Sequence, residues 1–202
     1  MLKLRMIALT LIMVLGVAGQ AQAQEEYNKR TGLFLGVGVG IAEANFDLET
    51  GNDEADMGAI VDLRAGWAFY DRWAVTVGLA PAAFVYKYKA GFGPFSKEGE
   101  RALTFVMYDV SGWYFQPIYK DIWKLFVRLG LGATKATDEV DGEESSSESS
   151  AGVILAAGLE GFFSKNFAFF AELYGRSYGV TFQGMDDTEI WLVGLTLGLN
   201  YR

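Results

Sequence analysis

The sequence contains no cysteine, no histidine and only three prolines among its 202 residues. Without cysteine, the chain can form no disulfide and can carry no lipid anchor on a cysteine. Without cysteine and histidine, it can build neither a His/Cys metal site nor a serine–histidine–aspartate catalytic arrangement. These absences exclude disulfide-stabilised folds and histidine-dependent enzymes, and we expect no cofactor.

The first 23 residues are typical of a cleaved secretory signal peptide. Lys3 and Arg5 give a positive start, residues 6–17 form an apolar run, and residues 21–23 (Ala-Gln-Ala) match the small-residue cleavage pattern. A membrane anchor is the alternative interpretation. However, the run is well short of the roughly 20 apolar residues needed to span a bilayer. We therefore expect residues 1–23 to be removed on export.

Removal of the signal leaves residues 24–202, which we expect to form one domain. The loss of Lys3 and Arg5 changes the net charge from −8 to −10. A chain this acidic is a poor match for nucleic-acid phosphates, so we expect no nucleic-acid partner. After the signal, no apolar run is long enough for a transmembrane helix. Because 51% of all residues are nonetheless hydrophobic, alternating strands explain the composition better.

Apolar side chains alternate with small or polar ones in eight segments, which is the period of a β-strand. In the last segment, Leu195 and Leu197 stand on one face, and Thr196 and Gly198 on the other. The eight predicted strands cover about residues 32–44, 58–70, 73–88, 101–115, 122–134, 151–163, 167–178 and 191–202.

Two of these strands are harder to interpret. In the third, Pro81 cannot donate a ladder hydrogen bond, so we expect a bulge or a register break there. Beyond it, Phe84, Tyr86 and Tyr88 continue an aromatic stripe. In the fourth strand both faces are apolar, and we place Asp109 inward.

The connections between the predicted strands alternate in length. The short ones cover residues 70–73, 116–122 and 164–166, and the long polar ones cover residues 45–57, 89–100, 135–150 and 179–189. Short turns at one end and long loops at the other are typical of an antiparallel up-and-down meander.

One face of nearly every strand is apolar and carries aromatic residues near its ends, such as Trp67, Trp73 and Trp123. Such rings are typical of the interfacial girdles of a membrane barrel. An open sheet edge in hydrocarbon would leave backbone groups unpaired, so we expect the strands to close. The sequence thus predicts an all-β, eight-stranded antiparallel transmembrane barrel. A soluble barrel with its polar face in water is the alternative.

The opposite face carries glycine, alanine and a few charged residues, which we place in the lumen. The charged set is Asp62, Arg64, Asp109, Lys124, Arg128, Glu160, Glu172 and Arg176. Buried charges need partners, and this set has both signs, so we predict an interior salt-bridge network. Its role is either a packed plug that holds the barrel shut or a path or gate for protons or ions. The narrow lumen of eight strands favours the plug.

The signal peptide, the eight alternating strands and the stretch GLEGFFSKNFAFFAELYGR (158–176) resemble the small outer-membrane β-barrels of Gram-negative bacteria. These are the OmpA-barrel, OmpX and OmpW-like proteins of the outer-membrane β-barrel domain family. Gly194, Leu197 and Leu199 resemble the C-terminal signal read by the barrel-assembly machinery. Arg202, however, stands where members usually end on an aromatic residue.

The resemblance implies a place in the outer membrane, with membrane lipid, lipopolysaccharide and the assembly machinery as partners. Enzymes among such barrels depend on a histidine, so we expect this protein not to be an enzyme. Asp62, Glu160 and Glu172 are inward carboxylates, but their spacing singles out no catalytic pair.

The long loops carry the remaining candidates. Residues 45–57 are rich in oxygen ligands of the kind calcium accepts, without the spacing of an EF-hand, and a solvated acidic loop is the alternative. Residues 89–100 combine Phe92 and Phe95 with lysines that could contact lipopolysaccharide phosphates or a partner. Residues 135–150 form an acidic, serine-rich loop of low complexity.

We therefore predict an outer-membrane barrel protein with a structural or surface-interaction role through its extracellular loops. The first alternative is a narrow porin-like channel for small solutes, as the OmpW likeness allows. The second is a soluble periplasmic barrel that binds a lipophilic ligand.

Overall fold

The computed structural model describes residues 31–46, 57–70, 72–90, 97–119, 122–140, 143–146, 150–180 and 188–201. The predicted signal peptide and most of the acidic first loop lie outside these residues, so both stay predictions. The described chain forms nine β-strands: β1 (Gly32–Phe46), β2 (Met57–Tyr70), β3 (Trp73–Ala90), β4 (Lys97–Tyr119), β5 (Trp123–Val140), β6 (Glu143–Ser146), β7 (Ser150–Phe162), β8 (Phe167–Val180) and β9 (Thr188–Tyr201). No helix among these residues is long and apolar enough to cross a membrane.

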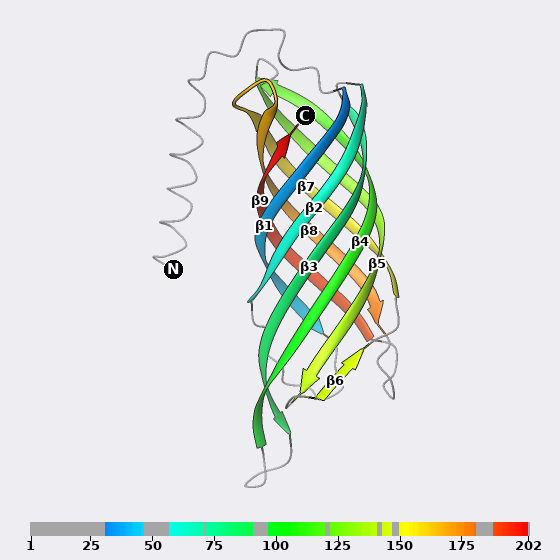
Figure 1. The fold of residues 1–202 in the computed structure, drawn as a ribbon, viewed down its shortest axis with the longest axis vertical. Helices are drawn as coiled ribbons and strands as arrows, with labels where there is room; N and C mark the ends of the chain where they lie inside the picture. The colour runs from blue at the N-terminus through cyan, green and yellow to red at the C-terminus, as the bar shows by residue number, and fades with distance from the viewer. Residues whose placement is uncertain are drawn as a thin grey trace, which may run out of the picture.

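Eight of these strands close into a barrel in which neighbouring strands run antiparallel (Figure 1). β1 to β5 pair in chain order, β5 pairs with β7, and β7 to β9 follow in order. β9 then pairs with β1, from Leu35 opposite Tyr201 to Phe46 opposite Ile190, and this ladder closes the wall. The predicted eight-stranded antiparallel barrel is confirmed.

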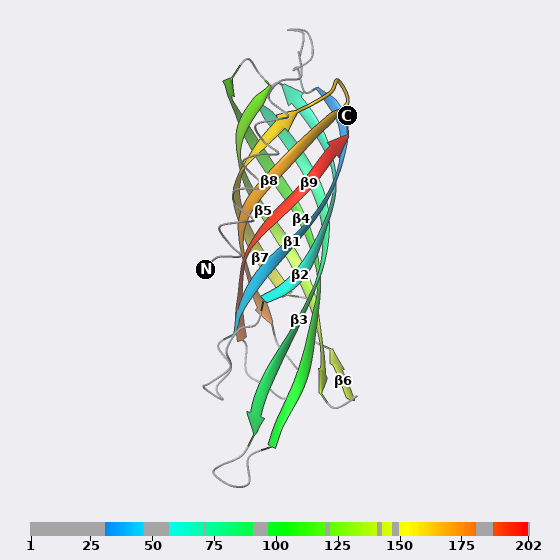
Figure 2. The same ribbon diagram turned by 90° about the vertical axis from the view of Figure 1, so that its left-hand side faces the viewer.

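The connections lie at opposite ends according to their length. In Figure 1 the strand ends that short connections join, and the end of β9, lie at the top, and the strand ends that long connections join lie at the bottom. β3 and β4 reach furthest at the long-connection end (Figure 2), where their ladder continues to Ala90 opposite Lys97. These strands are longer than the alternation predicts, because backbone pairing continues past the apolar stripe that marks the wall.

The connection predicted over residues 135–150 is partly a strand. β5 continues to Val140, and β6 turns back to pair with it, from Glu143 opposite Val140 to Ser146 opposite Thr137. The prediction of a continuous low-complexity loop is therefore wrong for residues 135–140 and 143–146. Beyond the barrel wall a hairpin needs no apolar face, so the alternation that reveals the other strands is missing here.

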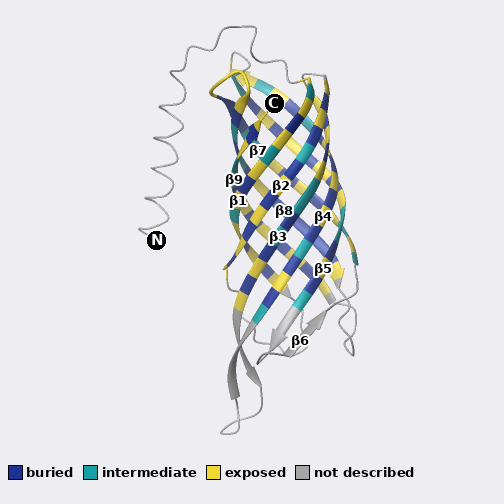
Figure 3. Cartoon of the chain, viewed as in Figure 1, coloured by how far each residue is buried: buried dark blue, intermediate teal, exposed yellow. Residues whose placement is uncertain are grey.

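The two faces of each wall strand differ in exposure (Figure 3). On β5, for example, Leu129 is 67% exposed and Leu131 is 71% exposed, whereas Arg128 is 2% exposed. The described wall strands repeat this pattern, with large apolar side chains outward. An apolar exterior of this extent suits lipid contact and argues against the soluble-barrel alternative.

Aromatic side chains gather on the outer face at the short-connection end. Trp73 on β3 packs against Tyr114 on β4, with ring centroids 5.0 Å apart. Phe167 on β8 packs against Tyr201 on β9, with ring centroids 5.1 Å apart. Such a ring of aromatics matches the girdle that transmembrane barrels place at the membrane interface.

Pro81 produces neither a bulge nor a register break, and that prediction is wrong. β3 keeps one register with β4 through Pro81, which lies opposite Val106. The ladder to β2 keeps its register as well, but it skips the pair of Val61 with Pro81 and the pair of Asp62 with Ala80. The missing N–H thus interrupts the ladder without shifting the strand. As a result, Phe84 faces the lumen and is 2% exposed.

Placing an arginine on the outer face tests whether that face contacts lipid. Leu129→Arg, near the middle of the apolar belt on β5, should lower the free energy of unfolding by about 2–4 kcal/mol. The matched Thr104→Arg, on the outer face toward the long connections, should cost only about 0–1 kcal/mol. Reversible urea unfolding of the barrel in lipid vesicles measures both. Equal costs at the two positions would contradict a lipid-facing belt.

Candidate functional site: a charged layer in the lumen

Three acids and three arginines form one layer across the middle of the lumen, called here the charged layer. Its members are Asp62 and Arg64 on β2, Asp109 on β4, Arg128 on β5, and Glu172 and Arg176 on β8. Side chains two or four positions apart in a strand point to the same face. Asp62 and Arg64 therefore both point into the lumen from β2, and Glu172 and Arg176 both do so from β8. All six residues are at most 5% exposed.

Glu172 joins two of the arginines. Its Oε2 lies 3.0 Å from Nη1 of Arg64, and its Oε1 lies 3.0 Å from Nη1 of Arg128. The carboxylate therefore bridges β2 and β5, which are not neighbours in the wall. Charged hydrogen bonds of this length are among the stronger ones in proteins.

The two aspartates each accept hydrogen bonds from side chains of the layer or beside it. Asp62 accepts from Nε of Arg64 at 3.0 Å and from Nη2 of Arg176 at 3.3 Å. Asp109 accepts from Nη2 of Arg128 at 3.1 Å and from the hydroxyl of its neighbour Ser111 at 2.6 Å. Asp62 thus accepts hydrogen bonds from two arginines, and Asp109 from one arginine and one serine hydroxyl.

The formal charges of the layer cancel, with three carboxylates against three guanidinium groups. A buried ion needs a partner because it loses its hydration, and each ion here has at least one within 4.0 Å. The layer therefore carries no net charge.

Glycines on neighbouring strands leave room for these side chains. A Cβ on Gly78 would lie 2.5 Å from Oδ2 of Asp109. A Cβ on Gly36 would lie 2.6 Å from Cγ of Arg64. Gly78 and Gly36 therefore leave the space that the paired charged side chain on the adjacent strand occupies.

Aromatic rings cover the charged layer on the side of the short connections. The guanidinium carbon of Arg64 lies 4.9 Å from the Trp113 ring centroid and 4.4 Å from that of Phe170. Trp113 also lies 5.4 Å from the guanidinium of Arg128, and its Nε1 donates to Thr76 at 2.8 Å. The remaining rings of this aromatic layer are Phe34, Phe115 and Phe126.

Apolar side chains fill the lumen on the side of the long connections. Phe84 and Phe105 meet edge to face, with ring centroids 5.6 Å apart. The other large members of this apolar layer are Ile60, Leu103, Met107, Tyr174, Tyr178, Ile190 and Leu192. The charged layer is thus enclosed between an aromatic layer and an apolar layer.

Lys124 and Glu160 form a second polar group toward the short connections. They lie opposite each other on β5 and β7. Nζ of Lys124 lies 5.5 Å from the Phe162 ring centroid, and Nδ2 of Asn200 donates to Glu160 at 2.7 Å. This group has one charge of each sign and is also buried.

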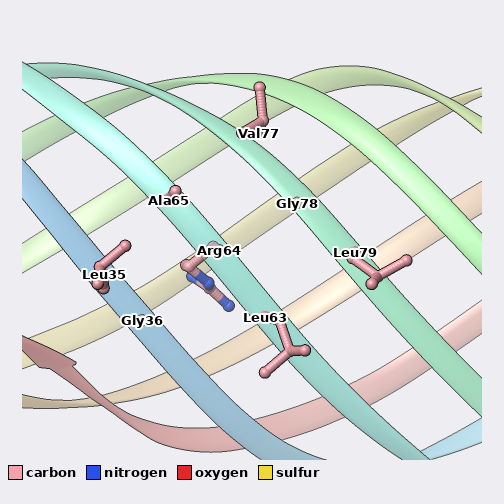
Figure 4. A pocket seen from close by; sticks show the side chains of 8 residues that line it. All are labelled: Leu35, Gly36, Leu63, Arg64, Ala65, Val77, Gly78 and Leu79. Atoms are coloured by element: carbon pink, nitrogen blue, oxygen red, sulfur yellow. The ribbon is translucent and has the colours of Figure 1, made fainter.

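The outer wall carries a shallow hollow between β1, β2 and β3 (Figure 4). Leu35, Leu63, Val77 and Leu79 surround Ala65 there, and the side chain of Arg64 lies behind the wall. The hollow lies within the apolar belt and suits acyl chains rather than a polar ligand.

Residues 8–202 match the model of the outer membrane protein beta-barrel domain family. The chain belongs to this family. No curated protein sequence matches it significantly.

Two solved barrels of similar fold are Neisserial surface protein A and the outer membrane protein OprG from Pseudomonas aeruginosa. The first is 17% identical, covers 85% of this chain and 97% of its own, and has a TM-score of 0.61. The second is 14% identical, covers 85% of this chain and 96% of its own, and has a TM-score of 0.55. At these identities the likeness concerns the fold of this outer-membrane barrel.

The structure places all eight predicted lumenal charges inside the barrel. Six of them meet in the charged layer, and Lys124 and Glu160 form the second group. Sequence reasoning missed the aromatic layer, although Trp113 and Phe170 occupy inward positions next to predicted lumenal charges. Within the described residues, no cluster of three or more His, Cys, Asp or Glu could hold a metal.

Removing one member of the charged layer tests its energetic role. Glu172→Gln leaves Arg64 and Arg128 without their shared carboxylate, so the free energy of unfolding should fall by about 3–5 kcal/mol. Adding Arg128→Met to that variant should recover part of the loss, because the layer then again holds as many carboxylates as guanidinium groups. Urea unfolding in lipid vesicles measures these differences.

The control for this experiment is Lys165→Gln in the exposed turn between β7 and β8, which should change stability by less than about 0.5 kcal/mol. A loss for Glu172→Gln no larger than that of the control would contradict a stabilising charged layer.

Proposed function

We propose that this family member is a sealed outer-membrane barrel that acts in envelope structure or surface interaction through its long connections. The observation that carries the proposal is the filled lumen. Across it lie the aromatic layer, the charge-balanced layer and the apolar layer, each made of buried side chains. An eight-stranded barrel has an interior just wide enough for such side chains.

The contacts of the charged layer favour a plug over an ion path. An ion would have to displace Glu172 from two arginines at 3.0 Å each and then cross the apolar layer. The cost of dehydration in that layer would not be offset by any charged group.

A non-enzymatic role is part of the proposal. The whole sequence lacks histidine, and the carboxylates of Asp62, Asp109 and Glu172 are each engaged by arginine. A carboxylate held in this way is a poor general base, because its lone pairs already accept hydrogen bonds from a permanent cation.

The short connections would face the periplasm and the long connections the outside of the cell, as in other barrels of this membrane. Membrane lipid and lipopolysaccharide would contact the apolar belt, and the assembly machinery would act during insertion. A partner outside the cell would meet the long connections, including the extended β3–β4 hairpin (Figure 2).

Conductance of the purified barrel in planar lipid bilayers tests the plug against the channel. The native protein should give no steady single-channel current. Trp113→Ala removes the bulkiest fully buried side chain but opens only the aromatic layer, so it should stay silent, as should Trp67→Ala on the outer face. The charged layer and the apolar layer still close the lumen in both variants. Steady current through the native protein would support the narrow channel instead.

A further inference from the structure

The hollow on the outer wall is a concave place within the lipid-facing belt, with a volume of about 420 Å³ (Figure 4). The short side chain of Ala65 leaves space there between larger neighbours on three strands, which are Leu35, Leu63, Val77 and Leu79. Such a lining suits a hydrocarbon chain. Because the hollow is continuous with the lipid-facing belt, the chain closest at hand is an acyl chain of the membrane.

The hollow lies at the depth of one bilayer leaflet. Trp67 on β2 and Trp73 on β3 lie on the outer face at the short-connection end, where they are 54% and 55% exposed. Val77 lies four residues beyond Trp73 on β3, which is about 13 Å along a strand. One leaflet contributes about 15 Å of hydrocarbon. An acyl chain that starts beside the two tryptophans therefore reaches the hollow.

A positive charge lies at the same end of the β2–β3 hairpin. Arg72 is an exposed residue of the turn, directly before Trp73, and Asp71 before it lies outside the described residues. The Arg72 carbonyl accepts from the N–H of Phe115 at 2.8 Å, which ties the turn to β4. Among the exposed residues that the structure describes at this end, Arg72 and Lys165 are the charged ones, and both are positive. A guanidinium beside interfacial aromatics is well suited to bind a lipid phosphate.

We propose that the β2–β3 hairpin binds one phospholipid. An acyl chain occupies the hollow, the glycerol region lies beside Trp67 and Trp73, and the phosphate binds Arg72. The choice of a phospholipid over lipopolysaccharide rests on the proposed function, in which the short connections face the periplasm and its phospholipid leaflet.

Titration with a phospholipid tests this site. The barrel is refolded in a non-ionic detergent, which has no phosphate, and bound phosphatidylglycerol is counted by native mass spectrometry. The native protein should bind one lipid saturably before any other. Arg72→Gln removes the phosphate contact and should weaken this binding by about two- to fivefold. Ala65→Leu fills the hollow and should weaken it at least as much.

Matched variants and lipids serve as controls. Lys165→Gln in the β7–β8 turn and Ala157→Leu on the outer face of β7 should leave the binding unchanged. Diacylglycerol, which has the acyl chains but no phosphate, should bind more weakly, and lipopolysaccharide should not displace the bound phosphatidylglycerol.

Four outcomes would each overturn the inference. They are uptake of several lipids with no preferred first one, unchanged binding in either Arg72→Gln or Ala65→Leu, equal binding of diacylglycerol, and displacement by lipopolysaccharide. These measurements do not depend on whether the lumen conducts, so the lipid site can fail while the sealed barrel stands.

Discussion

The need to pair every backbone N–H and C=O away from water governs this molecule. In hydrocarbon an unpaired group costs several kcal/mol, so a sheet that crosses a membrane must close. The ladder between β1 and β9 provides that closure. Once the wall is closed, the pleat sends alternate side chains to lipid and to lumen, and every other feature follows from which residues take which side.

Closure also brings distant residues together. Arg64, Arg128 and Glu172 come from three strands that are far apart in the chain, and they meet because the barrel is narrow. Glycines lie opposite the charges on adjacent strands and leave room for them, whereas the short distance across the lumen lets Arg64 lie over the rings of Trp113 and Phe170. The interior is therefore a packed core in which one layer of paired ions lies between an aromatic layer and an apolar layer.

Much of this architecture can be predicted from alternation alone, because the two faces of each strand meet different surroundings, lipid outside and packed side chains inside. The inward positions of Asp62, Arg128 and Glu172 were predictable in this way. Their partners were not, because pairing across the lumen depends on the registers around the whole barrel. Alternation also fails where no solvent contrast exists, as in the β5–β6 hairpin, and it does not show that Pro81 can be accommodated without a shift.

The seam between β1 and β9 has a consequence for how the wall is completed. β1 is the first strand of the described chain, and its partner β9 is the last. Until β9 is in place, one edge of β1 has no partner strand and must be kept from pairing with another chain. The wall can therefore close only after the last described strand has reached the membrane.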